Sequence, residues 1–129
     1  MDYVVTPRAP QAAGHYSQAV SHQGLVYVAG QVPRLNGPSG NPECPASIEA
    51  QAVLVFHNLA AILEAANSGI DRVLKLTIYL TDLGAWGTVN EICATVFGAH
   101  RPARTMVPVS NLRHHYQIEI DAIAAVRDM

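Results

Sequence analysis

The stretch SIEAQAVLVFHNLAAILEAANSGIDRVLKLTIYL, residues 47–80, decides the fold because it holds the clearest helical and strand patterns of the chain. From Ile48 to Ala66, apolar residues recur every three or four positions, which is the spacing of one helical face. Ser47 suits the N-cap, and Asn67-Ser68-Gly69 suits the C-terminal stop. We therefore predict one long amphipathic helix between these two signals.

The end of the same stretch changes to a period of two, which is typical of a half-buried strand. Over residues 73–80 the apolar side chains fall on one face and the more polar ones on the other. The apolar face is predicted to hold Leu74, Leu76, Ile78 and Leu80, and the opposite face Lys75, Thr77 and Tyr79.

Shorter elements surround this helix and strand, and together they give the order β-ββ-α-β-α-ββ. The predicted flanking elements are a run at Tyr3–Val5, a hairpin of Tyr16–Val20 and Leu25–Ala29 around a four-residue turn, a helix at Trp86–Phe97, and strands at Thr105–Val109 and Gln117–Val126. Residues 30–45 hold four prolines and three glycines, so they are predicted to form a loop, with a lid or interface arm as one interpretation. The simplest arrangement is a single α+β domain over residues 1–129, a two-layer sandwich with two helices on one face of a mixed sheet.

Composition narrows the class of partner. Half of the 129 residues are hydrophobic and 14% are charged, which predicts that some apolar surface faces another subunit. The net charge of −2 is spread without runs, so a nucleic-acid partner is not expected. The two cysteines form no C-x-x-C pair, and no basic leader or membrane-spanning run is apparent, so we expect a cytoplasmic protein without a membrane partner.

Common catalytic motifs are absent from the sequence. There is no phosphate-binding glycine loop, serine nucleophile elbow, H-E-x-x-H zinc motif or dinucleotide fingerprint. The pair His114-His115 has no carboxylate or thiol at ligand spacing, so we predict a solvated loop and no metal site. His57 lies off the apolar stripe of the long helix and is expected on its surface.

Two charged residues in the C-terminal strands are better candidates. Glu119 stands in the apolar run from Ile118 to Val126, where an unpaired charge is costly, and by strand parity Asp121 shares its face. Arg104 begins the preceding strand. A guanidinium fork suits a substrate carboxylate, and a glutamate of raised pKa can move a proton. The alternative is a structural ion pair between Arg104 and Glu119, and the pattern alone leaves both open.

Four segments resemble the RidA/YjgF family in its usual order. They are Gly14-His15-Tyr16-Ser17-Gln18-Ala19-Val20, Val26-Tyr27-Val28-Ala29-Gly30-Gln31-Val32-Pro33, Pro102-Ala103-Arg104-Thr105 and Ile118-Glu119-Ile120-Asp121-Ala122-Ile123-Ala124. The helix from Ile48 to Ala66 and the segment from Lys75 to Glu91 also resemble the family, so the similarity covers nearly the whole chain.

The resemblance implies a chorismate-mutase-like α+β fold, a homotrimer with clefts between subunits, and cofactor-free hydrolysis of 2-imino acids and enamines to 2-keto acids and ammonia. It also implies that Arg104 binds the substrate carboxylate and that Glu119 handles the water or proton. Tyr16 would line the cleft and Gly30 would form its floor. Asn90 matches a recurrent family asparagine, to which we assign a structural role.

Departures from the family pattern bear on the substrate. Met106 stands where relatives have a small residue or cysteine and is predicted to line the substrate site, and Arg101, in place of an aromatic residue, adds a charge suited to a dicarboxylate. His15 replaces a frequent proline, and Ala29 a frequent serine. Two other functions stay open: a trimer that binds keto acids without turnover, and the ribonuclease or translation-inhibitor activity of some relatives, which the unclustered charge disfavours.

Overall fold

A computed structural model of the chain describes residues 1–35 and 43–128. Within these residues six strands form one sheet in the order β1-β2-β3-β6-β4-β5. The strands are β1 (Asp2–Val4), β2 (Ala19–His22), β3 (Leu25–Gln31), β4 (Val73–Leu80), β5 (Ala103–Pro108) and β6 (Ile118–Ala125). Neighbouring strands run antiparallel except β4 and β5, which are parallel. The predicted mixed sheet is therefore confirmed.

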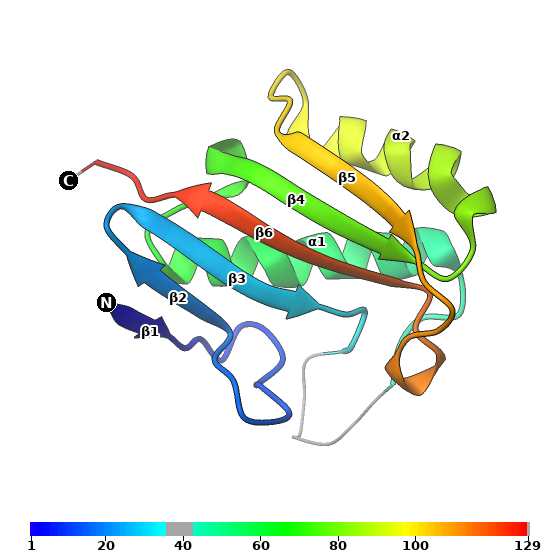
Figure 1. Cartoon of the computed structure of the whole chain (residues 1–129), viewed down its shortest axis with the longest axis horizontal. Coiled ribbons are helices and arrows are strands. Elements are labelled where there is room, and N and C mark those ends of the chain that lie inside the picture. The colour runs from blue at the N-terminus through cyan, green and yellow to red at the C-terminus, as the bar shows by residue number, and fades with distance from the viewer. Residues whose placement is uncertain (36–42, 129) are drawn as a thin grey trace.

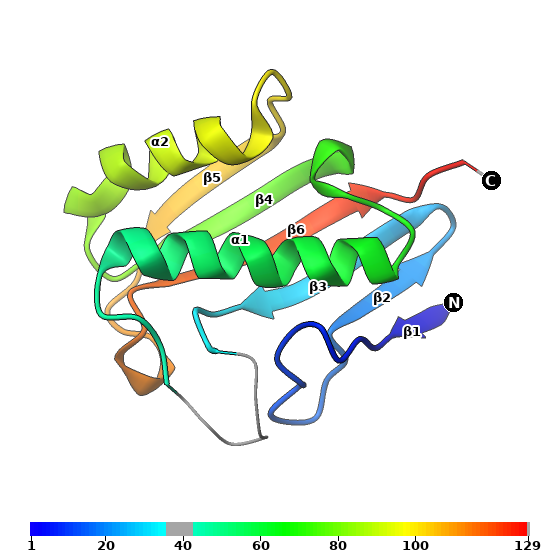
Figure 2. The ribbon, with the colours of Figure 1, turned by 180° about the vertical axis from the view of Figure 1, so that it is seen from behind.

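Both helices, α1 (Ile48–Ala65) and α2 (Trp86–Phe97), cover the same face of the sheet, as Figures 1 and 2 show from opposite sides. A parallel pair of strands cannot be joined by a tight turn, and α2 provides the crossover between β4 and β5. Among residues 1–35 and 43–128, no helix covers the other face of the sheet. The predicted two-layer α+β sandwich is confirmed.

The long helix α1 begins where the sequence predicts. Ser47 Oγ accepts a hydrogen bond from the backbone N–H of Ala50 at 3.1 Å, which satisfies one free donor of the first turn. Val55, Leu59 and Ile62 are fully buried against the sheet. By length and composition α1 could also cross a membrane, but half of it is buried inside the protein, so its apolar character is explained by its place in the core.

Strand β4 corrects one sequence prediction. Leu74 was expected on the buried face but is 48% exposed. Val73 pairs with Ala124 and Lys75 with Ile123, so two steps on β4 face one step on β6, and Leu74 is the extra residue of a β-bulge. Beyond the bulge Leu76, Ile78 and Leu80 are buried as predicted.

The first hairpin also differs from the prediction. Strand β2 starts at Ala19, later than expected, and continues to His22, so the turn is two residues rather than four. Gln23 and Gly24 both have positive φ, 52° and 81°, which is the conformation of a type I′ hairpin turn. The predicted lid or interface arm at residues 30–45 lies partly outside the described residues, although its first two residues belong to β3.

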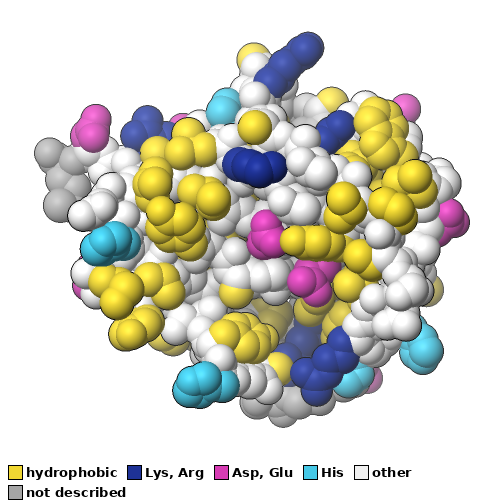
Figure 3. Space-filling view, in the orientation of Figure 1, with side chains coloured by type: hydrophobic (Ala, Val, Ile, Leu, Met, Phe, Trp, Pro, Cys, Tyr) yellow, Lys and Arg dark blue, Asp and Glu magenta, His cyan; other side chains and the backbone are white. Residues whose placement is uncertain are grey.

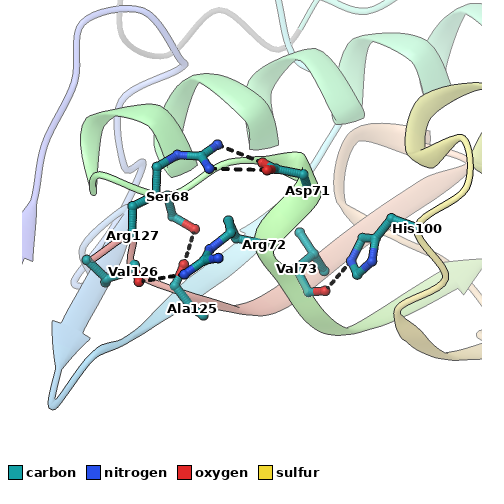
Figure 4. A network of polar contacts seen from close by, with 8 residues as sticks. All are labelled: Ser68, Asp71, Arg72, Val73, His100, Ala125, Val126 and Arg127. Atoms are coloured by element: carbon teal, nitrogen blue, oxygen red, sulfur yellow. Dashed lines mark hydrogen bonds and ion pairs between the residues drawn. The ribbon is translucent and has the colours of Figure 1, made fainter. Parts of the chain in front are cut away.

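Hydrogen bonds fix the ends of β6 and β4 at one side of the molecule (Figure 4). Ser68 Oγ donates to the carbonyl of Ala125 at 2.7 Å, and Arg127 forms an ion pair with Asp71. The ring nitrogen Nε2 of His100 lies 2.7 Å from the carbonyl oxygen of Val73. This contact ties the loop before β5 to the start of β4, and so sets where β5 begins.

The face of the sheet without helices is open and mixed in character (Figure 3). Tyr3 and Tyr27 point to this face and are 68% and 46% exposed. Glu119 and Asp121 point the same way from β6, because the residues between and beside them are buried on the helix side. The predicted shared face of these two carboxylates is confirmed.

Candidate active site

Glu119 lies over a gap in the neighbouring strand. The register between β3 and β6 shifts between Val28 and Gln31, and Gly30 stands within this irregular step. A Cβ atom at Gly30 would overlap the Glu119 carboxylate and lie 2.9 Å from its Cδ. Glycine at position 30 is therefore required for the carboxylate to occupy this place against the backbone of β3.

The environment of Glu119 favours its protonated form. Partial burial raises the pKa of its carboxyl group, and the nearby charge of Asp121 raises this pKa further. Asp121 accepts a hydrogen bond from the Tyr79 hydroxyl at 3.0 Å, which keeps Asp121 in place beside Glu119. The result is a carboxyl group that can both hold and release a proton nearer to neutral pH.

Tyr16 belongs to a loop that the buried side chain of Gln18 holds against the sheet. Gln18 Oε1 accepts from the Thr6 N–H at 2.7 Å, and Gln18 Nε2 donates to the Pro10 carbonyl at 2.9 Å. Tyr16 itself is 54% exposed, and its hydroxyl accepts from the Ala13 N–H at 3.1 Å. The hydroxyl contact thus positions the ring, while much of the side chain stays exposed to solvent.

Tyr16, Gly30 and Glu119 line one cavity of about 470 Å³, which we call the Glu119 cavity. The structure thus brings together three of the residues predicted for the site. The same cavity is also lined by Arg34, Arg113 and His114, which the sequence did not indicate as site residues. Figure 3 shows basic side chains beside a hollow below the acidic pair.

Arg104 lies in a second cavity, of about 510 Å³, which we call the Arg104 cavity. Its Nη1 donates to Asn90 Oδ1 at 2.9 Å, and its guanidinium carbon is 5.5 Å from the centre of the Trp86 ring. Burial raises the pKa of Cys93, and a hydrogen bond with Arg104 partly offsets this rise. Contacts from α2 therefore hold the guanidinium on several sides and leave further N–H donors for a ligand.

Arg101 and His100 also line the Arg104 cavity. Arg101 is exposed, whereas the contact of His100 with Val73 holds the histidine ring in place. The extra charge that the sequence places before β5 therefore lies on the Arg104 side of the protein and not beside Glu119.

Arg104 and Glu119 point to opposite faces of the sheet in one chain. Arg104 pairs with Leu76, whose side chain is buried under the helices, whereas Glu119 pairs with Tyr79 on the open face. The ion pairs Arg8–Glu64 and Arg127–Asp71 involve neither residue, and the opposite faces rule out the structural ion pair considered for Arg104 and Glu119.

The remaining candidate residues, Met106 and the histidines, lie in different environments. Met106 packs against the hydrophobic core and lines neither cavity, because it shares the helix-covered face with its neighbour Ile78. His57, His114 and His115 are exposed, as predicted. Across residues 1–35 and 43–128 no group of three or more His, Cys, Asp or Glu side chains is arranged to hold a metal ion.

Comparison with known proteins agrees with this architecture. The endoribonuclease L-PSP family model matches residues 6–126. The 2-iminobutanoate/2-iminopropanoate deaminase of Mus musculus is 39% identical over 121 residues, covering 94% of this chain and 88% of the relative. Protein HMF1 of Saccharomyces cerevisiae is 38% identical, covering 97% and 95%. The crystal structure of E. coli TdcF with bound serine superposes with a TM-score of 0.90 at 34% identity, covering 98% of this chain and all of that one.

The fold and the two cavities define a small α+β domain with candidate binding residues on both faces of one sheet. By the family model and these relatives, the chain belongs to the endoribonuclease L-PSP family, which is the YjgF/RidA family. The names of these proteins disagree: one relative is named a deaminase, whereas the family description names a ribonuclease. The reaction of this chain therefore has to be inferred from its own residues.

Proposed function

We propose that the protein hydrolyses 2-imino acids and their enamine tautomers to 2-keto acids and ammonia. Arg104 carries the proposal, because α2 holds its guanidinium at the wall of a cavity while no carboxylate of the described chain neutralises it. A fork of this kind binds a small carboxylate through paired, charge-assisted hydrogen bonds. The serine bound in the TdcF structure is an α-amino acid of the size expected for such a ligand.

The substrate site is completed by a second subunit in this proposal. One small molecule cannot touch Arg104 and Glu119 of the same chain, because the sheet lies between them. The open sheet face with its exposed tyrosines supports association of copies through that face. In a homotrimer, a head-to-tail contact would place the Arg104 cavity of one subunit against the Glu119 cavity of the next.

The proposed reaction uses side chains and water only. Arg104 holds the substrate carboxylate, and protonated Glu119 donates its proton to the imine nitrogen or, for an enamine, to the terminal carbon. A water oxygen then bonds to the C2 carbon while the Glu119 carboxylate accepts a proton from that water. When the C–N bond breaks, the nitrogen keeps its electron pair, takes the proton of the C2 hydroxyl and leaves as ammonia, while the C2–O bond becomes the carbonyl of the 2-keto acid.

The direct test measures ammonia and keto acid released from freshly generated 2-aminoacrylate and 2-iminobutanoate. The wild type is expected to accelerate both, and Arg104→Ala to lower kcat/KM by about 10²–10³-fold, as expected when one partner of a charged contact is lost. Arg104→Lys keeps the charge without the planar fork and should recover part of the loss. Full activity of Arg104→Ala with a native circular dichroism spectrum would remove Arg104 from the reaction.

A second candidate, RNA cleavage, is favoured by the description of the matching family. The spread charge and the net charge of −2 count against it, because phosphate binding needs a concentrated basic face. Cleavage of RNA that survives repurification and persists in Arg104→Ala would support this candidate. A third candidate is keto-acid binding without turnover; tight binding of 2-oxobutanoate with no acceleration of imine hydrolysis would support it.

A further inference from the structure

Two arginines from separate loops line the same cavity as Glu119. Arg34 follows β3, and Arg113 begins the 3-10 turn of Arg113–His115 between β5 and β6. Both lie close enough to the buried Tyr116 ring to lower its pKa by their charge, although burial, the larger effect, raises this pKa. Two arginines therefore line the Glu119 cavity, in addition to Arg104 in the other cavity.

The turn that carries Arg113 adopts an unfavourable backbone conformation. His114 and His115 both have positive φ, 55° and 60°, and two consecutive residues with side chains seldom adopt this region. A positive φ brings Cβ close to the following carbonyl oxygen, so this conformation is unfavourable for residues other than glycine. Strain of this kind persists where the surrounding structure holds it, and it is concentrated at functional sites.

Two contacts hold the turn that carries Arg113 in place. The His114 ring packs edge-on against Tyr116 with centroids 5.7 Å apart, and Tyr116 is 2% exposed. The N–H of Gln117 donates to Gln51 Oε1 of α1 at 2.9 Å. These contacts fix the chain directly after the strained residues.

The Arg34 side of the cavity is also anchored. The buried Asn58 of α1 donates through Nδ2 to the carbonyl oxygen of Arg34 at 3.1 Å. Arg113, by contrast, is exposed, and within residues 1–35 and 43–128 its guanidinium has no ion pair or side-chain hydrogen bond. The backbone is thus fixed beneath both arginines while the Arg113 fork is available to a ligand.

We propose that Arg113, together with Arg34, binds a second carboxylate at the far end of the substrate, so that the preferred substrates are 2-imino dicarboxylic acids. This proposal rests on the proposed function, in which Arg104 takes the carboxylate next to the imine and Glu119 moves the proton. A cavity of about 470 Å³ has more space than a three- or four-carbon imine fills. A planar carboxylate is the natural ligand of a guanidinium fork.

The position of the second charge distinguishes this proposal from the one that Arg101 suggests. Arg101 lines the Arg104 cavity and would sit beside the carboxylate that Arg104 already holds. Arg113 lies with Glu119, so it faces the part of the substrate that extends past the imine carbon. If Arg113 binds the second carboxylate, substitution of Arg113 should remove the preference for dicarboxylates. If Arg101 binds it, substitution of Arg101 should do so instead.

The test compares two imines of equal carbon number, 2-iminoglutarate and 2-iminopentanoate, each generated in the assay from its amino acid by an amino acid oxidase. The wild type should have a kcat/KM ratio that favours 2-iminoglutarate by about tenfold or more. Arg113→Gln should lower this ratio by about 10–100-fold, the range of one charge-assisted hydrogen-bonded contact. Arg8→Gln, which removes an exposed arginine paired with Glu64 on the helix side, is the matched control and should keep the ratio.

Two outcomes would overturn the proposal: a wild-type preference for 2-iminopentanoate, or a ratio that Arg101→Gln lowers and Arg113→Gln does not. Calorimetric measurement of 2-oxoglutarate and 2-oxopentanoate binding tests the dicarboxylate site independently of the proposed deaminase activity. If no imine is hydrolysed but 2-oxoglutarate binds more tightly and loses this advantage in Arg113→Gln, the deaminase is wrong and the dicarboxylate site stands. Equal binding of both keto acids would reject the site whatever the enzyme does.

Discussion

The Glu119 cavity and the Arg104 cavity differ in the charged group that each presents: an acid in the first and a guanidinium in the second. Around Glu119, burial and a neighbouring carboxylate raise the pKa of an acid, which makes a proton available. Around Arg104, an amide oxygen and an indole ring hold a permanent positive charge in one orientation. Each cavity has one half of what imine hydrolysis needs, and the sheet separates them. In the proposed function, these two half-sites are brought together by a second copy of the chain.

The largest expected effect is on the proton-transfer half. Glu119→Gln removes the ionisable group and keeps its shape, so kcat for 2-iminobutanoate should fall by about 10²–10⁴-fold, the usual contribution of a positioned acid–base group. The keto acid product should still bind, because Arg104 is unchanged. Glu64→Gln, at an exposed ion pair, is the control. Stopped assays of keto acid formation measure the change, and an unaltered kcat would assign proton transfer to another group.

A smaller loss is expected when Glu119 is displaced rather than removed. Gly30→Ala places a methyl group where the carboxylate lies, and a displacement of this size should cost about 10²-fold in kcat. Gly87→Ala is the matched control, because nothing lies within 4 Å of its added methyl group. A crystal structure of Gly30→Ala should show the Glu119 side chain turned from its wild-type position. Wild-type activity in Gly30→Ala would show that the close approach is not needed.

At the carboxylate-binding half-site, loss of Asn90, which supports Arg104, should lower activity less than loss of Arg104 itself. Asn90→Ala removes the hydrogen bond that orients the guanidinium, and KM should rise about tenfold while kcat changes less. Asn111→Ala, at an exposed position of the loop after β5, is the control and should leave KM and kcat unchanged. Steady-state kinetics over a range of 2-iminobutanoate supply rates separates the two constants. An equal fall in kcat and no change in KM would contradict a role in binding.

The smallest effect is on stability and depends on pH. Because the pKa of Glu119 is raised in the folded state, the fold binds a proton more tightly than the unfolded chain, so this group destabilises the fold as pH rises through its folded pKa. Glu119→Gln lacks this titration. Its Tm should therefore exceed that of the wild type by a small margin at pH 8, and by less or not at all at pH 4. A Tm difference that grows toward acid pH would contradict the raised pKa.

The periodic parts of the sequence predicted most of the fold. Both helices begin where their patterns indicate: α1 has the Ser47 cap and a buried face, whereas α2 has no side-chain cap and is determined by its buried face. Leu74 was misplaced because alternation assumes a regular ladder, and a bulge adds a residue without leaving a local signal. The early end expected for β2 has a similar cause, since polar His22 still pairs with Leu25.

The candidate site was only partly accessible from sequence. Strand parity placed Glu119 and Asp121 on one face, and family resemblance added Tyr16 and Gly30, which the structure brings to the same cavity. Parity within single strands could not show that Arg104 faces the other side, because that depends on how β5 pairs with β4.

Met106 follows the parity of Arg104 and enters the core rather than a cavity. Arg34 and Arg113 were missed because loop residues have no periodicity, and only the folded chain brings them to Glu119. The one available signal was Arg113 beside the pair His114-His115, and the position of this segment next to Glu119 cannot be deduced from spacing.

The measurement that tests the account most directly is complementation between Arg104→Ala and Glu119→Gln subunits. The two inactive variants are unfolded together, refolded as a mixture and assayed with 2-iminobutanoate. If each site takes Arg104 from one subunit and Glu119 from its neighbour, random assembly restores both groups in about a quarter of the sites, and activity should return to that level. A mixture that assembles into mixed oligomers, shown by native mass spectrometry, and stays as inactive as its parents would contradict the shared site.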